Sequence, residues 1–217
     1  MGALKVRFIM LWISSLFALH ISAFAKQDGF FPVENREQLV QQFNENSASI
    51  KTIQSTFVQK KQLEFLDETI ISKGTFWFKK ENNLRWAYHE PFEYVIVIHD
   101  RKFQIMDGEQ LSAYDIESNP AFAEINNLIV NMVRGYITDE RFEMAALENS
   151  KQYLVKLAPK DPVLKDVIST MEIYFNKSDL TVEEVVMRES EKDYTVITFI
   201  DKQINEAIED RVFSVDY

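Results

Sequence analysis

The chain has 217 residues, contains no cysteine and carries a formal net charge of −10 at pH 7. The lack of cysteine excludes a disulfide scaffold, and it also excludes a lipoprotein whose lipid is attached to a cysteine. The acidic balance argues against nucleic acid and anionic membrane surfaces as partners, because both repel negative charge. Any interaction with a membrane is therefore expected to be apolar rather than electrostatic.

The beginning of the chain has the pattern of a secretory signal peptide. Lys5 and Arg7 precede an apolar run at residues 8–19, and the small residues Ala23 and Ala25 suit a cleavage site. The run is shorter than the roughly 18 apolar residues of a membrane-spanning helix. We predict a signal peptide at residues 1–25 and one exported domain at residues 26–217; an uncleaved N-terminal anchor is the alternative.

The first part of the predicted domain combines one helix with a series of strands. Residues 34–48 are predicted to form a helix, with Leu39, Val40 and Phe43 as a modest apolar stripe. Alternation of apolar and polar residues then predicts strands at residues 52–66, 72–80, 84–89, 93–98, 102–106 and 110–115. Asp107 and Gly108 are expected to join the last two strands, both at positive φ, in a tight hairpin. This order predicts an antiparallel meander.

A helical interlude is predicted in the middle of the chain. Residues 119–135 form the clearest amphipathic pattern, and residues 138–147 are predicted to form a second, shorter helix. Further strands are predicted at residues 152–158, 167–175, 182–189, 194–200 and 207–215. A sheet of about ten strands must curl. The sequence therefore predicts an α+β fold, mainly antiparallel β: an incomplete, half-open β-barrel with a helical lid over its concave face.

Two neighbouring predicted strands carry bulky side chains on one face. Phe76 and Phe78 share a face of the first strand, and Leu84, Trp86 and Tyr88 share a face of the second. These side chains can line a hollow that receives an apolar ligand, or they can fill a packed core between sheet and helices. Both interpretations predict burial, and only an enclosed void separates them.

The residues of common catalytic sites are sparse. Beyond the predicted signal peptide the chain has two histidines, His89 and His99, at opposite ends of neighbouring predicted strands and without a second ligand at metal-binding spacing. The sequence contains no Gly-x-Ser-x-Gly elbow, phosphate-binding glycine loop or dinucleotide fingerprint. We predict a protein that is not an enzyme and that uses no metal or other cofactor.

Several short motifs occur in a fixed order. They are Ser-Thr-Phe-Val-Gln at residues 55–59, Gly-Thr-Phe-Trp-Phe-Lys-Lys at 74–80, Leu-Arg-Trp-Ala-Tyr at 84–88, Pro91, and Arg-Val-Phe at 211–213. With these motifs behind a signal peptide, the chain from about residue 39 to residue 215 resembles the outer-membrane lipoprotein carrier family, the periplasmic LolA-type proteins.

The resemblance implies a monomeric periplasmic carrier. It would accept lipoproteins from an inner-membrane lipoprotein-releasing transporter and deliver them to an outer-membrane acceptor. Such a carrier is needed because exposing one sixteen-carbon acyl chain to water costs roughly 13 kcal/mol, at about 0.8 kcal/mol per methylene. The alternative is an exported relative that carries another amphiphile in envelope assembly, such as a glycolipid or a lipid-pigment precursor.

The resemblance also implies roles for individual residues. The side chains expected to contact acyl chains, from the two strands and the predicted lid helix, are Phe76, Phe78, Trp86, Tyr88, Phe122, Ile125, Ile129 and Met132. Lys80 stands where the family has an arginine that hydrogen-bonds the lid, so it is either a lid latch without the planar fork of arginine or a solvated turn residue. Arg85 is expected on the convex face, in a surface salt bridge.

Overall fold

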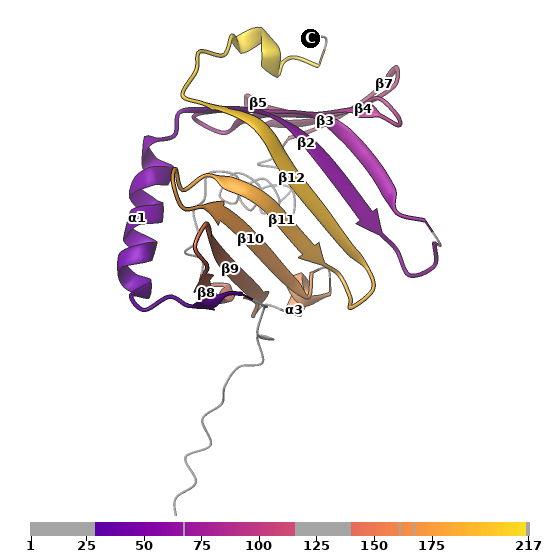
Figure 1. The fold of residues 1–217 in the computed structure, drawn as a ribbon. Helices are drawn as coiled ribbons and strands as arrows, with labels where there is room; N and C mark the ends of the chain where they lie inside the picture. Colours follow the sequence, from indigo (N-terminus) through magenta and orange to yellow (C-terminus); the bar gives the residue numbers. More distant parts are fainter. Residues whose placement is uncertain (1–28, 67, 116–139, 161, 167, 216–217) are drawn as a thin grey trace, which may run out of the picture.

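The computed structural model describes residues 29–66, 68–115, 140–160, 162–166 and 168–215 (Figure 1). Its strands form one antiparallel sheet of twelve in the order β1-β8-β9-β10-β11-β12-β2-β3-β4-β5-β6-β7. The strands are β1 (Phe31–Pro32), β2 (Thr52–Gln62), β3 (Ile70–Lys79), β4 (Asn83–Glu90), β5 (Tyr94–His99), β6 (Lys102–Asp107), β7 (Gln110–Asp115), β8 (Phe142–Glu148), β9 (Gln152–Pro159), β10 (Thr170–Asn176), β11 (Val182–Arg188) and β12 (Tyr194–Ile204). Because β1 and β7 lie at opposite ends of this order, the sheet is open, and the predicted half-open barrel is confirmed.

Helix α1 (Arg36–Ser49) closes one side of the curved sheet (Figure 1). Asn35 caps its N-terminus, since its side chain accepts a hydrogen bond from the backbone N–H of Gln38. Leu39 and Phe43 are buried one helical turn apart, and the Phe43 ring lies 4.3 Å from the ring of Phe175 on β10. This contact anchors α1 to the sheet.

The main hydrophobic core lies on the inner face of the sheet, the face toward which α1 packs. Period-two alternation directs side chains to this face from both halves of the sheet, for example Phe76 and Phe78 on β3 and Ile173 and Phe175 on β10. Since one continuous cluster joins these strands to α1, the two halves share a single core.

The outer face carries a second, smaller cluster beneath the C-terminal segment. The 3₁₀ turn η1 (Asp210–Phe213) places Val212 and Phe213 over Val97 of β5. Arg85 of β4 is buried there, and its guanidinium donates a 2.6 Å hydrogen bond to the backbone carbonyl of Ser214. The expectation that Arg85 lies exposed at the surface is therefore wrong, because the C-terminal segment covers it.

Two predicted elements have a different structure. Residues 142–148, predicted as the end of a short helix, form strand β8, which pairs with β9 on one side and β1 on the other. Methionine, alanine and leucine favour helix, but strand pairing and the inward burial of Phe142 outweigh that preference. Residues 207–215, predicted as a strand, contain η1 instead. The predicted lid helix at residues 119–135 lies outside the described residues.

The hairpin between β6 and β7 forms where the sequence predicts it. Asp107 pairs with Gln110, so Gly108 and Glu109 make a two-residue loop. Gly108 has a φ of 56°, whereas Asp107 is not among the residues at positive φ. Glycine in the first loop position matches a type II′ turn rather than the expected Asp-Gly pair.

No helix in the described ranges combines the length and apolarity needed to cross a membrane.

Candidate functional site

An aromatic cluster lies at the centre of the inner face. The Trp86 ring makes edge-to-face contacts with Phe57 at 5.1 Å and Phe76 at 5.1 Å, and it lies 6.1 Å from Phe199. Tyr88 extends the cluster along β4 by packing edge-on against Phe57 at 5.1 Å. These contacts join β2, β3, β4 and β12 into one wall.

Gly74 makes room for this cluster. A Cβ atom at this position would lie 2.0 Å from the carbonyl oxygen of Ala87 and 2.8 Å from the ring of Phe57. Glycine is therefore required where Phe57 lies over β3. The glycine of the sequence motif at residues 74–80 thus has a packing role beneath the wall.

Trp86 carries an unusual polar group into this apolar cluster. The side chain is 7% exposed, and its indole N–H has no hydrogen-bond acceptor in the part of the chain that the structure describes. Leaving a buried donor unpaired costs about 1–3 kcal/mol. A ligand with a carbonyl oxygen in this region could offset that cost.

An apolar groove opens beside Tyr88, between β3, β4, β5 and β6. Its volume is about 430 Å³, within the range of small-molecule sites. The residues that line it are Ile70, Ser72, Tyr88, Glu90, Pro91, Phe92, Tyr94, Ile96 and Asp107. The groove therefore lies next to the aromatic cluster, with Tyr88 belonging to both.

Tyr88 is held in a position between groove and cluster. Its hydroxyl donates a 2.9 Å hydrogen bond to the side-chain oxygen of Gln59 on β2. Burial, with a smaller contribution from the neighbouring Tyr94, raises the pKa of Tyr88 from 10.0 to about 12. The phenol of Tyr88 therefore keeps its proton to a higher pH than an exposed tyrosine does.

The rim of the groove carries exposed apolar side chains. Phe92, in the turn between β4 and β5, is 80% exposed, and Ile70, at the start of β3, is 40% exposed. Phe65, in the connection between β2 and β3, is also exposed and lies at the same end of these antiparallel strands. Apolar residues gathered around the mouth of a groove are typical of a surface that meets another apolar surface.

The residues predicted to bind lipid fall into three groups. Phe76 and Phe78 are fully buried and Trp86 nearly so, whereas Tyr88 reaches the groove. The others, Phe122, Ile125, Ile129 and Met132, lie outside the described residues. Tyr94 and Ile96 also line the groove, and their alternation on β5 continues the inner face beside Trp86 and Tyr88.

Lys80, the predicted lid latch, contacts α1. Its ammonium donates a 2.5 Å hydrogen bond to the carbonyl of Ala48 in the last turn of the helix. A cation at this place also interacts favourably with the negative end of the helix dipole. This contact fixes α1 to the turn between β3 and β4, and the latch role stays a prediction.

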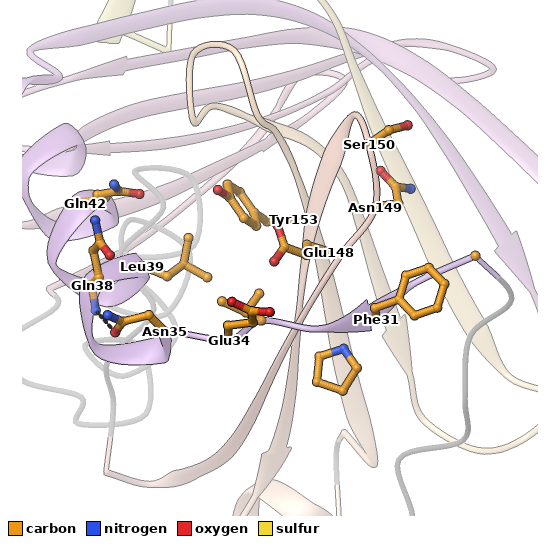
Figure 2. Close-up of a pocket in the computed structure, with 13 residues that line it drawn as sticks. Phe31, Glu34, Asn35, Gln38, Leu39, Gln42, Glu148, Asn149, Ser150 and Tyr153 are labelled. Carbon is orange, nitrogen blue, oxygen red and sulfur yellow. Dashed lines mark hydrogen bonds between the residues drawn. The ribbon is translucent and has the colours of Figure 1, made fainter.

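A second hollow lies between α1, β1 and the β8–β9 hairpin (Figure 2). It is larger, at about 720 Å³, and polar side chains of Glu34, Gln38 and Gln42 share its lining with apolar ones. Figure 2 shows Gln42 extending from α1 toward the side of the hollow where Tyr153 lies. We call this hollow the polar cleft.

The two histidines have ordinary hydrogen-bond partners. His89 lies 2.9 Å from the hydroxyl of Thr75, and His99 lies 2.6 Å from the side-chain oxygen of Asn83. Within the described ranges no group of three or more histidine, aspartate or glutamate residues is arranged to hold a metal ion. Neither histidine lines the groove or the polar cleft.

Two solved structures share this fold, and a third has a lower similarity. MucB matches 83% of this chain and 64% of its own with a TM-score of 0.52 and 10% identity. The MucA/MucB complex of Pseudomonas aeruginosa matches 82% of this chain and 60% of that chain, with a TM-score of 0.50 and 12% identity. A LolA superfamily protein from Nitrosomonas europaea matches 82% of this chain and 98% of its own, with a TM-score of 0.45 and 11% identity. No curated protein sequence matches the chain.

The open antiparallel sheet with an apolar inner wall defines the class of half-open β-barrels. The family model described as "Outer membrane lipoprotein carrier protein LolA" matches residues 48–216, so the chain belongs to this family. The resemblance drawn from the sequence motifs is confirmed. Family membership indicates a lipid- or lipoprotein-binding protein of the cell envelope.

Proposed function

We propose that this protein is a periplasmic carrier that binds the acyl chains of lipoproteins and transfers them from the inner to the outer membrane. The observation that carries the proposal is the apolar groove beside Tyr88, which adjoins a buried aromatic cluster on the inner face of an open sheet. Residues 1–25 would direct export as a cleaved signal peptide, and residues 26–217 would form the single carrier domain.

In this proposal the groove is where the ligand first contacts the wall. An acyl chain would lie against Tyr88, Tyr94 and Ile96, and its burial would contribute about 0.8 kcal/mol per methylene. The exposed rim at Phe92 and Ile70 would face the apolar surface that supplies or receives the chain. The donor would be an inner-membrane lipoprotein-releasing transporter and the recipient an outer-membrane acceptor, with the carrier acting as a monomer.

Release sets a limit on how tightly the wall can bind. A carrier must hold its cargo less strongly than the receiving membrane does. We therefore expect the open and closed states of its predicted lid to have similar free energies. The unpaired indole N–H of Trp86 is compatible with this requirement, because the cargo-free wall retains an unsatisfied donor that a cargo carbonyl would satisfy.

A second candidate function is the carriage of another amphiphile, such as a glycolipid or a lipid-pigment precursor. The volume of the groove favours it, since about 430 Å³ lies near the lower end of the range for ligand sites. That space suits one acyl chain better than the several chains of a lipoprotein. Mass spectrometry of the protein isolated from its native periplasm separates the two functions: one predicts bound acylated proteins, the other free lipids.

A matched pair of substitutions tests the binding wall. Ile70 and Ile71 are adjacent on β3 and both exposed, at 40% and 50%, but only Ile70 lines the groove. We expect Ile70→Asp to weaken binding of dodecanoate and of a triacylated peptide by about tenfold, because a carboxylate at the groove disfavours an apolar chain. Ile71→Asp should leave both affinities unchanged. Equal losses in the two variants, or no binding by the unaltered protein, would contradict the proposal.

A further inference from the structure

A narrow apolar crevice opens at the opposite end of the inner wall from the groove. It has a volume of about 20 Å³, enough for about one water molecule. The residues that line it are Ile50, Ile53, Ser55, Phe76, Thr181, Val182, Phe199, Lys202 and Ile204. Because Phe76 and Phe199 also contact one another in the aromatic cluster, the crevice and the groove adjoin the same apolar wall.

Lys202 is the one charged residue among the described residues that line the crevice. The pairing of β12 with β2 shifts register between Ile200 and Gln203, and Asp201 in this irregularity has a φ of 53°. The shift places Lys202 beside β11, where its ammonium donates hydrogen bonds to the Thr181 hydroxyl at 2.6 Å and to the Val182 carbonyl at 3.1 Å. The register shift in β12 thus lies next to Lys202, the positively charged residue at this apolar crevice.

Among the described residues, the positive charge of Lys202 has no direct counter-ion. In the described ranges no carboxylate lies within 4.0 Å of its ammonium. The nearby Asp179 accepts hydrogen bonds from the backbone and hydroxyl of Thr181, while Glu183 accepts from Gln152 and Asn176. An ammonium has three N–H donors, so one remains for a ligand.

The surroundings of the ammonium disfavour its charge. Burial lowers the pKa of Lys202 from its ordinary value, and the more distant charges of Asp179 and Glu183 oppose this effect only in part. A half-buried cation in this situation is stabilised by any anion that enters the crevice. The site therefore favours a negative ligand over a neutral one.

We propose that Lys202 binds the anionic oxygen headgroup of an amphiphile whose acyl chain lies along the inner wall. This inference rests on the proposed acyl-chain binding and specifies the class of amphiphile. The carboxylate or phosphate would accept a hydrogen bond from the remaining N–H of Lys202, and the chain would extend past Phe76 and Phe199. Because the crevice holds only about one water, the side chains that line it must separate when the chain enters.

Two probes of equal chain length separate the contribution of the headgroup to affinity from that of the acyl chain. Dodecanoate carries a carboxylate and 1-dodecanol does not, whereas the apolar contacts are the same for both. We expect the unaltered protein to prefer dodecanoate by about tenfold, and we expect Lys202→Gln to remove that preference. Lys202→Arg, which keeps the charge, should retain part of it. Dodecyl phosphate in place of dodecanoate distinguishes a phosphate site from a carboxylate site.

Lys51 supplies the matched control. It is exposed and follows the crevice residue Ile50, and within the described part of the chain its hydrogen bonds are made by its backbone rather than by its side chain. Lys51→Gln should therefore keep the preference for dodecanoate, and thermal unfolding of each variant will show whether the fold is retained. Equal affinity of the unaltered protein for both probes, or a preference that survives Lys202→Gln, overturns the inference while acyl binding stands. Binding of neither probe overturns both proposals.

Discussion

The groove beside Tyr88 and the polar cleft differ in both size and chemistry. The groove has a volume of about 430 Å³ and is lined largely by apolar and aromatic residues of β3–β6. The polar cleft is larger, at about 720 Å³, and presents Glu34, Gln38 and Gln42 beside α1 (Figure 2). Volume alone would select the cleft as the ligand site, whereas the chemistry of the linings selects the groove for an acyl chain.

The polar lining of the cleft is largely explained by local structure. Asn35 caps α1, Asn149 accepts hydrogen bonds from the backbone in the β8–β9 turn, and Glu148 pairs with Lys177. The apolar rim of the groove has no such explanation, because Phe92 is 80% exposed and Ile70 40% exposed to water. An unexplained apolar surface is the stronger indication of function.

The largest effect that separates the two regions is expected from Phe76→Ala. Phe76 is fully buried in the wall that supports the groove, so this change should lower the free energy of unfolding by about 3–5 kcal/mol. Denaturation in urea, followed by circular dichroism, measures this loss. A loss below about 1 kcal/mol would mean that the Phe76 ring faces open space rather than packed side chains.

A smaller effect is expected from the ionisation of Tyr88. In the unfolded chain its phenol ionises near pH 10, whereas in the folded protein its pKa is about 12. The folded state therefore keeps the proton longer, and stability that is present below pH 10 is lost as the pH rises toward 12. The loss is at most roughly 2.7 kcal/mol, the equivalent of that difference in pKa.

Tyr88→Phe should weaken this pH dependence. The difference between the unaltered protein and the variant, measured as the free energy of unfolding at pH 9 to 12, isolates Tyr88 from the other tyrosines. If the two curves stay parallel across this range, the phenol is solvated, and the groove reaches deeper into the wall than the contacts of Tyr88 indicate.

The sequence predicts most of the sheet because alternation is a local signal. Phe76 and Phe78, and likewise Trp86 and Tyr88, lie two residues apart, and the structure places each pair on the inner face. Residues 142–148 were harder to predict, because a run rich in alanine, methionine and leucine fits a helix when its partners are unknown. The conformation of this segment is decided by its pairing with the neighbouring strand β9 and with β1, which lies far earlier in the chain.

The binding site is less predictable than the fold. Tyr94 and Ile96 alternate on β5 as Trp86 and Tyr88 do on β4, but no local pattern shows where the wall leaves space for a ligand. Arg85 shows the same limit, since its burial depends on a segment more than a hundred residues further along the chain. The position of a groove, and the burial of a residue by a distant segment, depend on the assembled fold. The alternation of side chains along a strand carries no information about either.

The smallest effect is expected from the polar cleft. Gln42→Ala and Gln38→Ala should each change the free energy of unfolding by less than about 0.5 kcal/mol, because neither side chain has a hydrogen-bond partner in the described part of the chain. Dodecanoate affinity should also stay unchanged, in contrast to the loss in Ile70→Asp. If either glutamine variant lowers that affinity as much as Ile70→Asp does, the amphiphile reaches the cleft as well as the groove. The two hollows would then be parts of one site, with the apolar part holding the chain and the polar part holding the headgroup.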